Sequence, residues 1–439
     1  MSLKQTKVWL VSANMGYGHL RAVYPLKDIS ENEIIVVGRN GEASEAEKVL
    51  WARIIDIYEM LSRARGIPFI GKSIFKLLDS FLHIPSYYPR RNLSGATFQV
   101  NLLESSVKKG LCSGMFEKIN AKPLPLVTSF YAPAIAADMK GYEEIYCIIC
   151  DSDLNRVWVA RDPWESRVIY FAPCGKAAQR LRDYGVPEER IFLTGFPLPQ
   201  TLLGDRKLSV LKKDLAQRLF YLDPYKRFRN RNEKNVEHFL GKRNLHFKND
   251  RKLTISYSVG GAGAQMDIGG RIALSLKNKL LNNEINLNLI AGVKENVKDY
   301  FDEIKNREFK DCDNLKVFYS PEIPQYFEIF NKLMRTTDIL WTKPSELSFY
   351  CALGIPIIMT PTLGSQEKFN RQWLREIQAG ISQENPDYAD QWLFDWLNKG
   401  RLAEAAWDGF LKARKLGTYN IKDIVTKGKM PGYNSPVLR

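Results

Sequence analysis

Two glycine-bearing turns, far apart in the chain, constrain the fold most strongly. The first, SANMGYGH at residues 12–19, directly follows the strand-like run KVWLV. The second, SVGGAGAQ at residues 258–265, directly follows the strand-like run LTISY. Each turn brings backbone N–H groups and the start of a helix-like stretch to one point, where a phosphate can bind. Two such turns, one opening each half, predict two Rossmann-like domains that face each other across a cleft.

Length and composition are consistent with two domains. The chain has 439 residues, 45% of them hydrophobic, which is enough for two sizeable cores. No apolar run reaches the roughly 18 residues of a membrane-spanning helix, and the chain enters a strand without a signal-peptide pattern. The six cysteines are scattered, and the C-x-x-C of Cys147 and Cys150 lies inside an apolar, strand-like run. We therefore expect reduced thiols and a cytoplasmic protein.

Positive charge is concentrated in one segment. The net charge is +15, and residues 205–252 hold 15 Lys and Arg against 6 Asp and Glu. This segment is interpreted as a basic insertion between the domains. It could bind nucleic acid, bind anionic lipid head groups at about 1 kcal/mol per basic residue, or remain solvated without a partner. Because no nucleic-acid-binding motif accompanies the charge, we expect an anionic membrane surface and no nucleic acid.

A second segment has membrane-like character. Residues 67–88, IPFIGKSIFKLLDSFLHIPSYY, combine aromatic and aliphatic side chains with interleaved lysines, and Pro-Arg-Arg follows. Such a segment can lie in a membrane interface. A helix that packs into the protein core is an equally open interpretation.

The order of patterns is that of an α/β protein. Apolar runs predict strands at residues 7–11, 33–38, 124–128, 145–150, 168–172, 190–194, 253–258, 287–291, 315–318, 339–341 and 356–360. Helical patterns occupy residues 46–63, 102–120, 175–184, 271–281 and 295–305, and the chain after Gly380 is helical and Trp-rich. The domains expected are 1–204, an insertion at 205–252, a second domain at 253–385, and C-terminal helices at 386–439.

Three blocks carry a resemblance to a known family. They are SANMGYGHLRA near the N-terminus, residues 145–198 (IYCIICDSD to LTGFPL), and residues 336–370 (TTDILWTKPSELSFYCALGIPIIMTPTLGSQEKFN). The chain resembles the two-domain (GT-B) glycosyltransferases of the family that contains monogalactosyldiacylglycerol synthase and the processive diacylglycerol glucosyltransferases. The second and third blocks are specific signals, and together the blocks span both halves.

The resemblance implies a GT-B fold and an inverting hexosyl transfer. The N-terminal domain would bind a lipid or other hydroxyl acceptor, and the C-terminal domain a nucleotide diphosphate sugar, expected to be UDP-linked. No metal and no further cofactor are implied. The protein would work in the cytoplasm, peripherally at the inner membrane face. Two alternatives stay open: a catalytically silent relative that binds a nucleotide sugar or lipid, and a nucleotide-sugar 2-epimerase on the same fold.

The first turn supplies the expected base. His19 ends the turn at the carboxyl edge of the first strand, which faces the ligand crevice in an open α/β sheet. An imidazole with an ordinary pKa near 6.5 suits general-base chemistry, and the family's catalytic histidine falls on this position. Gly16 and Gly18 of the turn, with Asp151 and Asp153 after the strand at 145–150, are expected at the acceptor site. Aspartates that cap turns are an equally ordinary interpretation of that pair.

The second turn and the third block supply the expected donor site. Gly260, Gly261 and Gly263 would receive the diphosphate, since backbone donors and a helix dipole stabilise a leaving group's charge. The resemblance adds the following residues: Lys343, Ser345, Glu346, Gln366, Glu367 and Asn370. Gln366 and Glu367 would contact sugar hydroxyls, and Asn370 would open the next helix.

The sequence departs from the family pattern at the donor site. Ser345 and Glu346 replace the family's Gly-Gly pair, and its ribose-binding glutamate falls on Cys351. Two residues are also missing before Gly354, and Tyr17 replaces a glycine of the first turn. A thiol is a poor partner for a ribose diol, so we expect Glu346 to take over this role. The alternative is that Glu346 faces water in the first turn of its helix.

Overall fold

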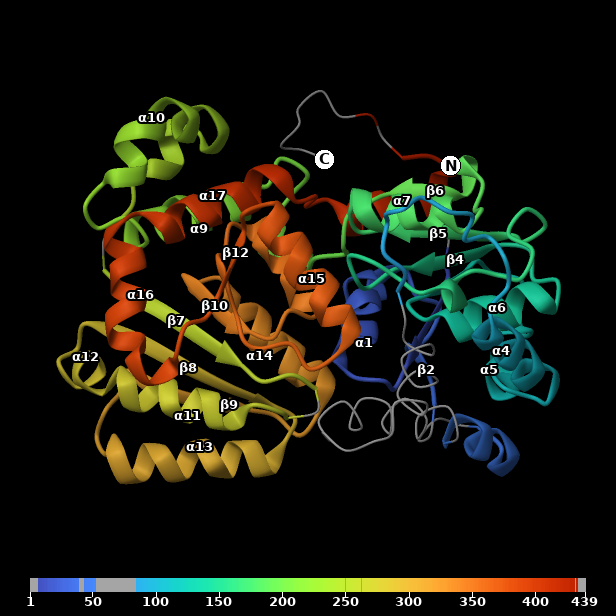
Figure 1. Ribbon diagram of the computed structural model, residues 1–439, viewed down its shortest axis with the longest axis horizontal. Coiled ribbons are helices and arrows are strands. Elements are labelled where there is room, and N and C mark those ends of the chain that lie inside the picture. The colour runs from blue at the N-terminus through green and yellow to red at the C-terminus, as the bar shows by residue number, and fades with distance from the viewer. Residues whose placement is uncertain are drawn as a thin grey trace. The chain divides into compact units, whose positions relative to one another are not determined.

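The computed structural model describes residues 7–38, 43–52, 84–248, 250–261, 263–430 and 432, and these form two compact units. The first unit holds the described residues up to Pro197, together with those of Leu363–Phe369 and Leu416–Gly432. The second holds Leu198–Thr362 and Asn370–Lys415. Figure 1 labels the elements of both units.

The first unit is built on a six-stranded parallel sheet of order β2-β1-β3-β4-β5-β6. Its strands are β1 (Trp9–Ala13), β2 (Ile35–Val37), β3 (Leu126–Thr128), β4 (Ile145–Ile148), β5 (Val168–Ala172) and β6 (Ile191–Leu193). Its helices are α1 (Tyr17–Val23), α4 (Phe98–Lys108), α5 (Ser113–Ile119), α6 (Tyr131–Met139), α7 (Gly175–Asp183) and α18 (Gly417–Lys427), with short 3₁₀ turns η1 (Tyr24–Ile29), η2 (Arg156–Trp158) and η3 (Glu188–Arg190). All residues of β1, β3 and β4 are buried, as parallel strands covered on both faces must be.

The second unit repeats this plan with a sheet of order β12-β11-β10-β7-β8-β9. Its strands are β7 (Leu253–Ser258), β8 (Ile285–Gly292), β9 (Leu315–Tyr319), β10 (Ile339–Thr342), β11 (Ile357–Met359) and β12 (Gly380–Ser382). Its helices are α8 (Gln200–Leu203), α9 (Ser209–Tyr221), α10 (Arg227–Leu240), α11 (Met266–Ser275), α12 (Lys277–Leu281), α13 (Glu295–Glu308), α14 (Ile323–Met334), α16 (Ala389–Asn398) and α17 (Arg401–Lys412), with 3₁₀ turns η4 (Lys242–Leu245), η5 (Glu346–Leu353) and η6 (Pro386–Tyr388). Helix α15 (Ser365–Glu376) begins in the first unit and continues in the second. Figure 1 shows α11 and α13 side by side along β8 and β9.

The two Rossmann-like sheets and all eleven expected strands are confirmed, within two residues at each end. The helical interpretation of the chain after Gly380 is wrong at its start, because Gly380–Ser382 pairs with β11 as the edge strand β12. The single helix expected at residues 102–120 is two helices. They are separated by Gly110 (φ 104°) and Cys112 (φ 68°), whose left-handed backbone cannot continue a helix.

The basic segment at residues 205–252 is not a separate insertion. Helix α9 buries Leu211, Leu215 and Leu219 in the second unit. The buried Arg218 guanidinium donates hydrogen bonds to the carbonyls of Thr337 (2.7 Å), Leu353 (2.9 Å) and Met334 (3.1 Å). The apolar residues recur every four positions, and the surrounding lysines and arginines obscure this core-facing stripe in the sequence.

The C-terminal helices divide between the two units. Helices α16 and α17 belong to the second unit, whereas α18 belongs to the first. There the Asn420 amide donates to the Thr194 carbonyl (2.8 Å), and Gly417 lies so close to the Phe196 carbonyl oxygen that a Cβ would be 2.3 Å away. Residues 67–83 of the amphipathic segment and residues 53–63 of the helix expected at 46–63 lie outside the described residues. No helix among the described residues is long and apolar enough to cross a bilayer.

Candidate functional site

His19 lies where the first turn meets helix α1. Gly16, at φ 98°, precedes the helix, and this left-handed backbone explains the need for glycine there. The His19 Nδ1 atom is 2.7 Å from the Ser129 carbonyl oxygen at the end of β3, the strand that neighbours β1. A carbonyl only accepts hydrogen bonds, so Nδ1 carries the proton and Nε2 is the proton-accepting nitrogen of the neutral ring. This tautomer is the one that a general base needs.

Aromatic rings surround the imidazole of His19. The Phe130 ring lies edge-on with its centroid 4.8 Å from that of His19, and the Trp158 centroid lies at 6.2 Å. Tyr131 packs against Trp158 at 5.4 Å. The buried Arg156 fixes the turn that carries Trp158, since its guanidinium donates to the carbonyls of Val159, Ala160 and Ser94. Phe130 and Trp158 are buried and pack around the imidazole, whereas the half-buried Tyr131 ring can contact an apolar acceptor.

Sequence reasoning missed these rings. The available signal was the sequence Ser-Phe-Tyr directly after β3, at the same sheet edge as His19.

The two aspartates after β4 differ in their surroundings. The Asp153 carboxylate is fully buried, pairs with Arg180 at 2.8 and 3.0 Å, and accepts from the Leu154 N–H. Burial raises the pKa of the Asp153 carboxyl, and the hydrogen bonds and charge of Arg180 oppose that rise. The expected acceptor role of Asp153 is therefore wrong, because no part of its carboxylate reaches the surface. Asp151 is half-buried, and its role stays a prediction, as does that of Gly18 in the first turn of α1.

The second turn is covered by a lysine side chain. A Cβ on Gly260 would lie 2.2 Å from Lys343 Cε and 3.0 Å from its Nζ. The lysine follows β10, which pairs with β7 in the register Ser258 to Thr342. Only glycine leaves room for this ammonium group directly over the turn. The sequence placed both residues at the donor site, and the structure brings them together.

A second lysine lies on the other flank of this turn. Gly263 has φ 70°, and a Cβ there would lie 3.0 Å from Val297 Cγ2 and 3.4 Å from Lys294 Cγ. Lys294 precedes α13 after β8, and β8 is the other neighbour of β7. Sequence reasoning missed Lys294, although its place directly after an apolar strand was visible. The stem of Lys294 therefore lies beside the turn, and lysines next to a glycine-rich turn can hold a diphosphate.

Gln265 fixes the position of the turn. It has φ 67°, and its amide Nε2 donates to the Pro361 carbonyl (2.8 Å) while its Oε1 accepts from the Thr360 hydroxyl (2.7 Å). Its own carbonyl accepts from the Tyr257 hydroxyl (2.5 Å). These bonds tie the turn to β7 and to the chain after β11, so an anion would meet a prearranged site.

The residues after β10 form the 3₁₀ turn η5. Ser345 precedes the turn, and the half-buried Glu346 is its first residue. Cys351 is fully buried, and its carbonyl oxygen would lie only 2.5 Å from a Cβ on Gly409 of α17. The Cys351 thiol is thus covered by protein and cannot contact a ribose. The roles of Ser345 and Glu346 in donor binding stay predictions.

The third block continues into helix α15. The Glu367 carboxylate, 8% exposed, accepts from the N–H of Leu363 (2.7 Å) and of Gly364 (3.4 Å), which orders the loop before the helix. Asn370 is fully buried inside the helix, so the expectation that it opens a helix is wrong, because α15 begins at Ser365. Gln366 is half-buried, and sugar contacts by Gln366 and Glu367 stay predictions.

Comparisons with known proteins agree with this fold. Residues 293–425 match a family model described as a domain of unknown function (DUF6938). Processive diacylglycerol β-glucosyltransferase from Bacillus cereus (strain AH187) is 22% identical over 389 residues, which cover 86% of this chain and 82% of that protein. The chain is thus similar to the processive diacylglycerol glucosyltransferases, at low identity but over most of its length.

Solved structures show the same architecture. The S. aureus MnaA-UDP co-structure matches with a TM-score of 0.50 and 12% identity, covering 97% of this chain and 99% of that one. A putative UDP-N-acetylglucosamine 2-epimerase from Listeria monocytogenes matches with a TM-score of 0.50 and 11% identity, covering 97% and 98%. The expected GT-B fold class is confirmed.

Proposed function

We propose that the protein is an inverting glycosyltransferase that transfers a hexose from a UDP-linked sugar to the hydroxyl of a lipid. The observation that carries the proposal is the hydrogen bond from His19 Nδ1 to the Ser129 carbonyl (2.7 Å). It orients Nε2 as a base at the carboxyl edge of β1, where acceptors are expected. Nε2 would take the acceptor's hydroxyl proton while the oxygen attacks the anomeric carbon and the bond from that carbon to the diphosphate oxygen breaks.

Residues of the second unit would stabilise the leaving group. As UDP departs, negative charge grows on its terminal phosphate. Backbone N–H groups of the turn at Gly260 and Gly261 would donate to this phosphate, and the ammonium groups of Lys343 and Lys294 would offset its charge. Glu346 would accept hydrogen bonds from the ribose hydroxyls. These groups would stabilise the leaving group without a metal ion.

The acceptor class rests on the relatives and on surface charge. Relatives 22% identical to the chain are named processive diacylglycerol β-glucosyltransferases. The half-buried Tyr131 ring, which packs against Trp158 near His19, suits an apolar acceptor. The basic residues of 225–252 would hold the protein at an anionic membrane surface, at the cytoplasmic face.

The experiment combines donor binding with product analysis. The protein is incubated with diacylglycerol in mixed micelles and, in turn, with UDP-glucose, UDP-galactose and UDP-N-acetylglucosamine. Mass spectrometry of the lipid fraction should show one added hexose with one of the donors. Binding of UDP without any glycosylated lipid across the panel would favour a catalytically silent relative instead.

A second candidate function is epimerisation at C2 of a UDP-sugar. It is favoured by the fold match at TM-score 0.50 to a protein described as a putative UDP-N-acetylglucosamine 2-epimerase. Incubation with UDP-N-acetylglucosamine and no acceptor distinguishes the two reactions. A C2 epimer in the nucleotide fraction would replace the glycosyltransferase proposal, whereas an unchanged nucleotide sugar would leave it standing.

A further inference from the structure

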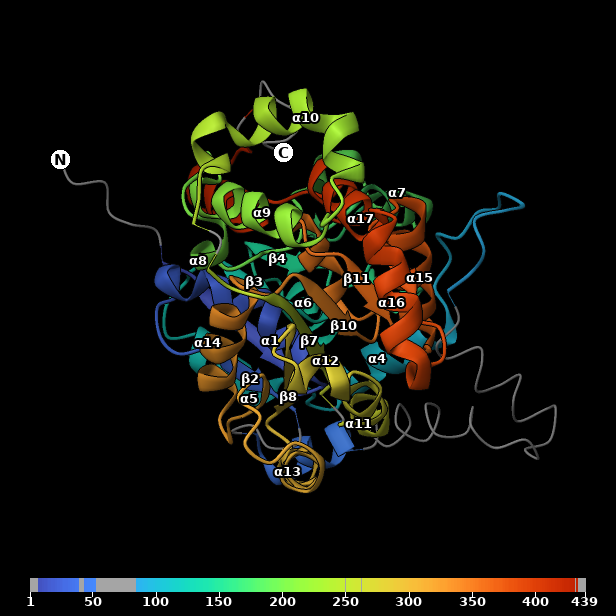
Figure 2. The same ribbon diagram turned by 90° about the vertical axis from the view of Figure 1, so that its left-hand side faces the viewer.

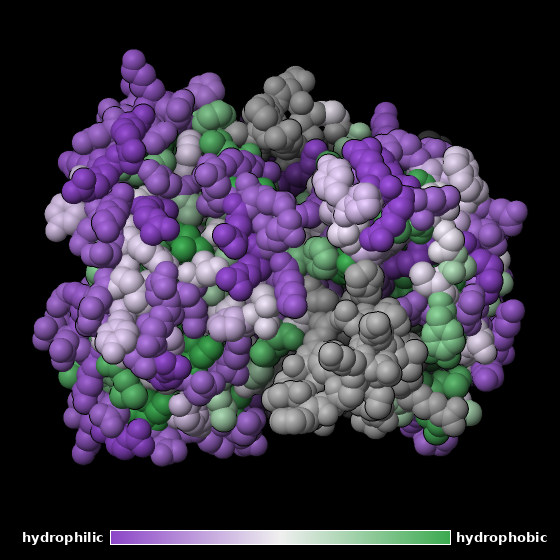
Figure 3. Space-filling view, viewed as in Figure 1, coloured by the Kyte–Doolittle hydropathy of each residue, from purple (hydrophilic) through white to green (hydrophobic). Residues whose placement is uncertain are grey.

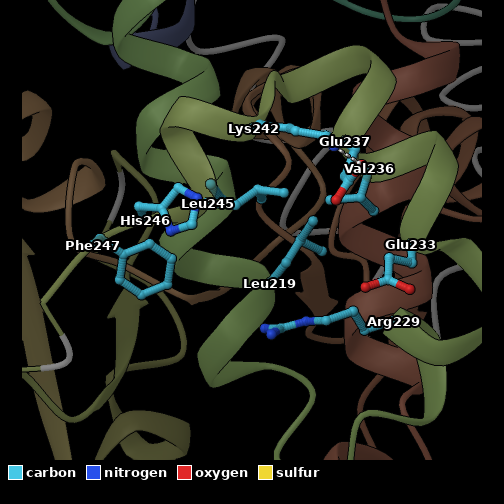
Figure 4. Close-up of a pocket in the computed structure, with 10 residues that line it drawn as sticks. Leu219, Arg229, Glu233, Val236, Glu237, Lys242, Leu245, His246 and Phe247 are labelled. Carbon is cyan, nitrogen blue, oxygen red and sulfur yellow. Dashed lines mark ion pairs between the residues drawn. The ribbon is translucent and has the colours of Figure 1, made fainter.

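A pocket lies within the basic segment of the second unit, between α9, α10 and η4 (Figure 4). Its volume is about 360 Å³. Apolar side chains form much of its wall: Ala216, Leu219, Val236, Leu245 and Phe247. Charged or titratable side chains complete it: Arg229, Glu233, Glu237, Lys242 and His246. The pocket thus combines an apolar wall with a polar rim, as sites for amphiphilic ligands do.

Arg229 is the cation that points into this pocket. Figure 4 shows its side chain running from α10 toward Leu219. Its backbone N–H is fixed by the Asp223 carboxylate (2.8 Å), and its guanidinium lies 5.5 Å from the centre of the Phe220 ring. Within the described part of the chain, no carboxylate pairs with this half-buried guanidinium. Its N–H groups are therefore available to an anion from outside.

Among the charged side chains that line the pocket, Arg229 is the one placed to bind an anion. Lys242 and Glu237 offset each other at 3.6 Å, and Glu233 lies in an exposed part of the rim. With the pocket's own charges included, residues 225–252 hold ten Lys and Arg against three Asp and Glu. Figure 3 shows the region around α10 as a mostly hydrophilic surface, and Figure 2 shows α10 at one end of the second unit. Tyr225, 64% exposed, adds an aromatic ring of the kind found at membrane interfaces.

We propose that this pocket binds the phosphate-bearing head group of an anionic membrane lipid. The lipid phosphate pairs with the Arg229 guanidinium, whose planar fork matches phosphate oxygens. The glycerol and first acyl carbons lie against the half-buried Leu245 and Phe247. This inference rests on the proposed function at a membrane, and it adds a specific lipid site to a general electrostatic attraction.

The test separates this pocket from diffuse surface charge. Binding of soluble dihexanoyl phosphatidic acid is measured by calorimetry, without nucleotide sugar, for wild type, Arg229→Gln and Lys234→Gln. Lys234 is exposed on the same helix and outside the pocket, so both variants lose one positive charge. Arg229→Gln should weaken binding about tenfold or more, the usual effect of losing a charged hydrogen bond. Lys234→Gln should stay within about twofold, the scale of a screened surface charge.

Two further measurements complete the test. Arg229→Lys keeps the charge but loses the fork, and it should bind more weakly than wild type. Equal affinities for the Arg229→Gln and Lys234→Gln variants would overturn the proposal in favour of diffuse attraction. Inorganic phosphate that binds as tightly as the lipid would overturn it in favour of a free-phosphate site. Because no sugar donor is present, failure of glycosyl transfer would contradict the proposed function without affecting this result.

Discussion

Replacing Gly260 by alanine should move Lys343 and thereby weaken diphosphate binding. The new Cβ would lie 2.2 Å from Lys343 Cε and 2.9 Å from Cδ, so the lysine must leave its place over the turn. The clashing atoms belong to the far part of a flexible side chain, and we expect a stability change of less than about 1 kcal/mol. A displaced ammonium no longer reaches the phosphates, which costs about 1.5–3 kcal/mol, or roughly 10- to 150-fold in UDP affinity.

Calorimetric titration with UDP and with uridine measures this effect. Affinity for UDP should fall, whereas affinity for uridine, which has no phosphate, should not change. Lys343→Met should have a similar effect, and the double variant should be no worse than either single variant, since both remove one interaction. Gly95→Ala, where a Cβ meets nothing within 4 Å, is the matched control. Unchanged UDP affinity in the Gly260 variant, or fully additive losses, would refute the reasoning.

Three other tests examine the ribose site, the buried ion pair and the membrane surface. Glu346→Ala should weaken UDP binding by about 1.5–3 kcal/mol, whereas Cys351→Ala should leave it unchanged because the thiol is buried. Equal UDP affinities of the two variants in calorimetry would mean that the ribose binds elsewhere. Asp153→Asn should destabilise the fold by about 3–5 kcal/mol, because it leaves the buried Arg180 without its partner; a denaturation midpoint close to wild type would contradict this. Binding to anionic vesicles should weaken as salt approaches 0.5 M, where the Debye length is about 4 Å; sedimentation that is insensitive to salt would argue against an electrostatic surface.

The fold could be predicted because the central strands of both sheets are buried on both faces. Such strands appear in the sequence as short apolar runs, and every such run from 7–11 to 356–360 is a strand of one of the two sheets. The helices of the basic segment could not be predicted as core elements. The three leucines of α9 that face the core are outnumbered by the charged side chains around them.

The site residues that lie in a single turn could be predicted from the sequence. A site residue whose position depends on the order of the strands was missed. His19 and the Gly260 turn are local features of the sequence. Lys294 reaches the same turn only because β8 pairs with β7, a neighbour relation that no local pattern reveals. Asp153 was misjudged for a similar reason, since its partner Arg180 lies 27 residues further along the chain.

The central claim is that His19 acts as the base in a sugar transfer. Its most direct test is the rate of hexose transfer to diacylglycerol by His19→Ala, measured alongside UDP affinity. The account predicts a transfer rate lower by roughly 10²–10⁴-fold, the contribution of a positioned base, with UDP affinity unchanged. A transfer rate within a factor of about two of wild type would be a far smaller loss than removal of a general base causes, and it would contradict the account.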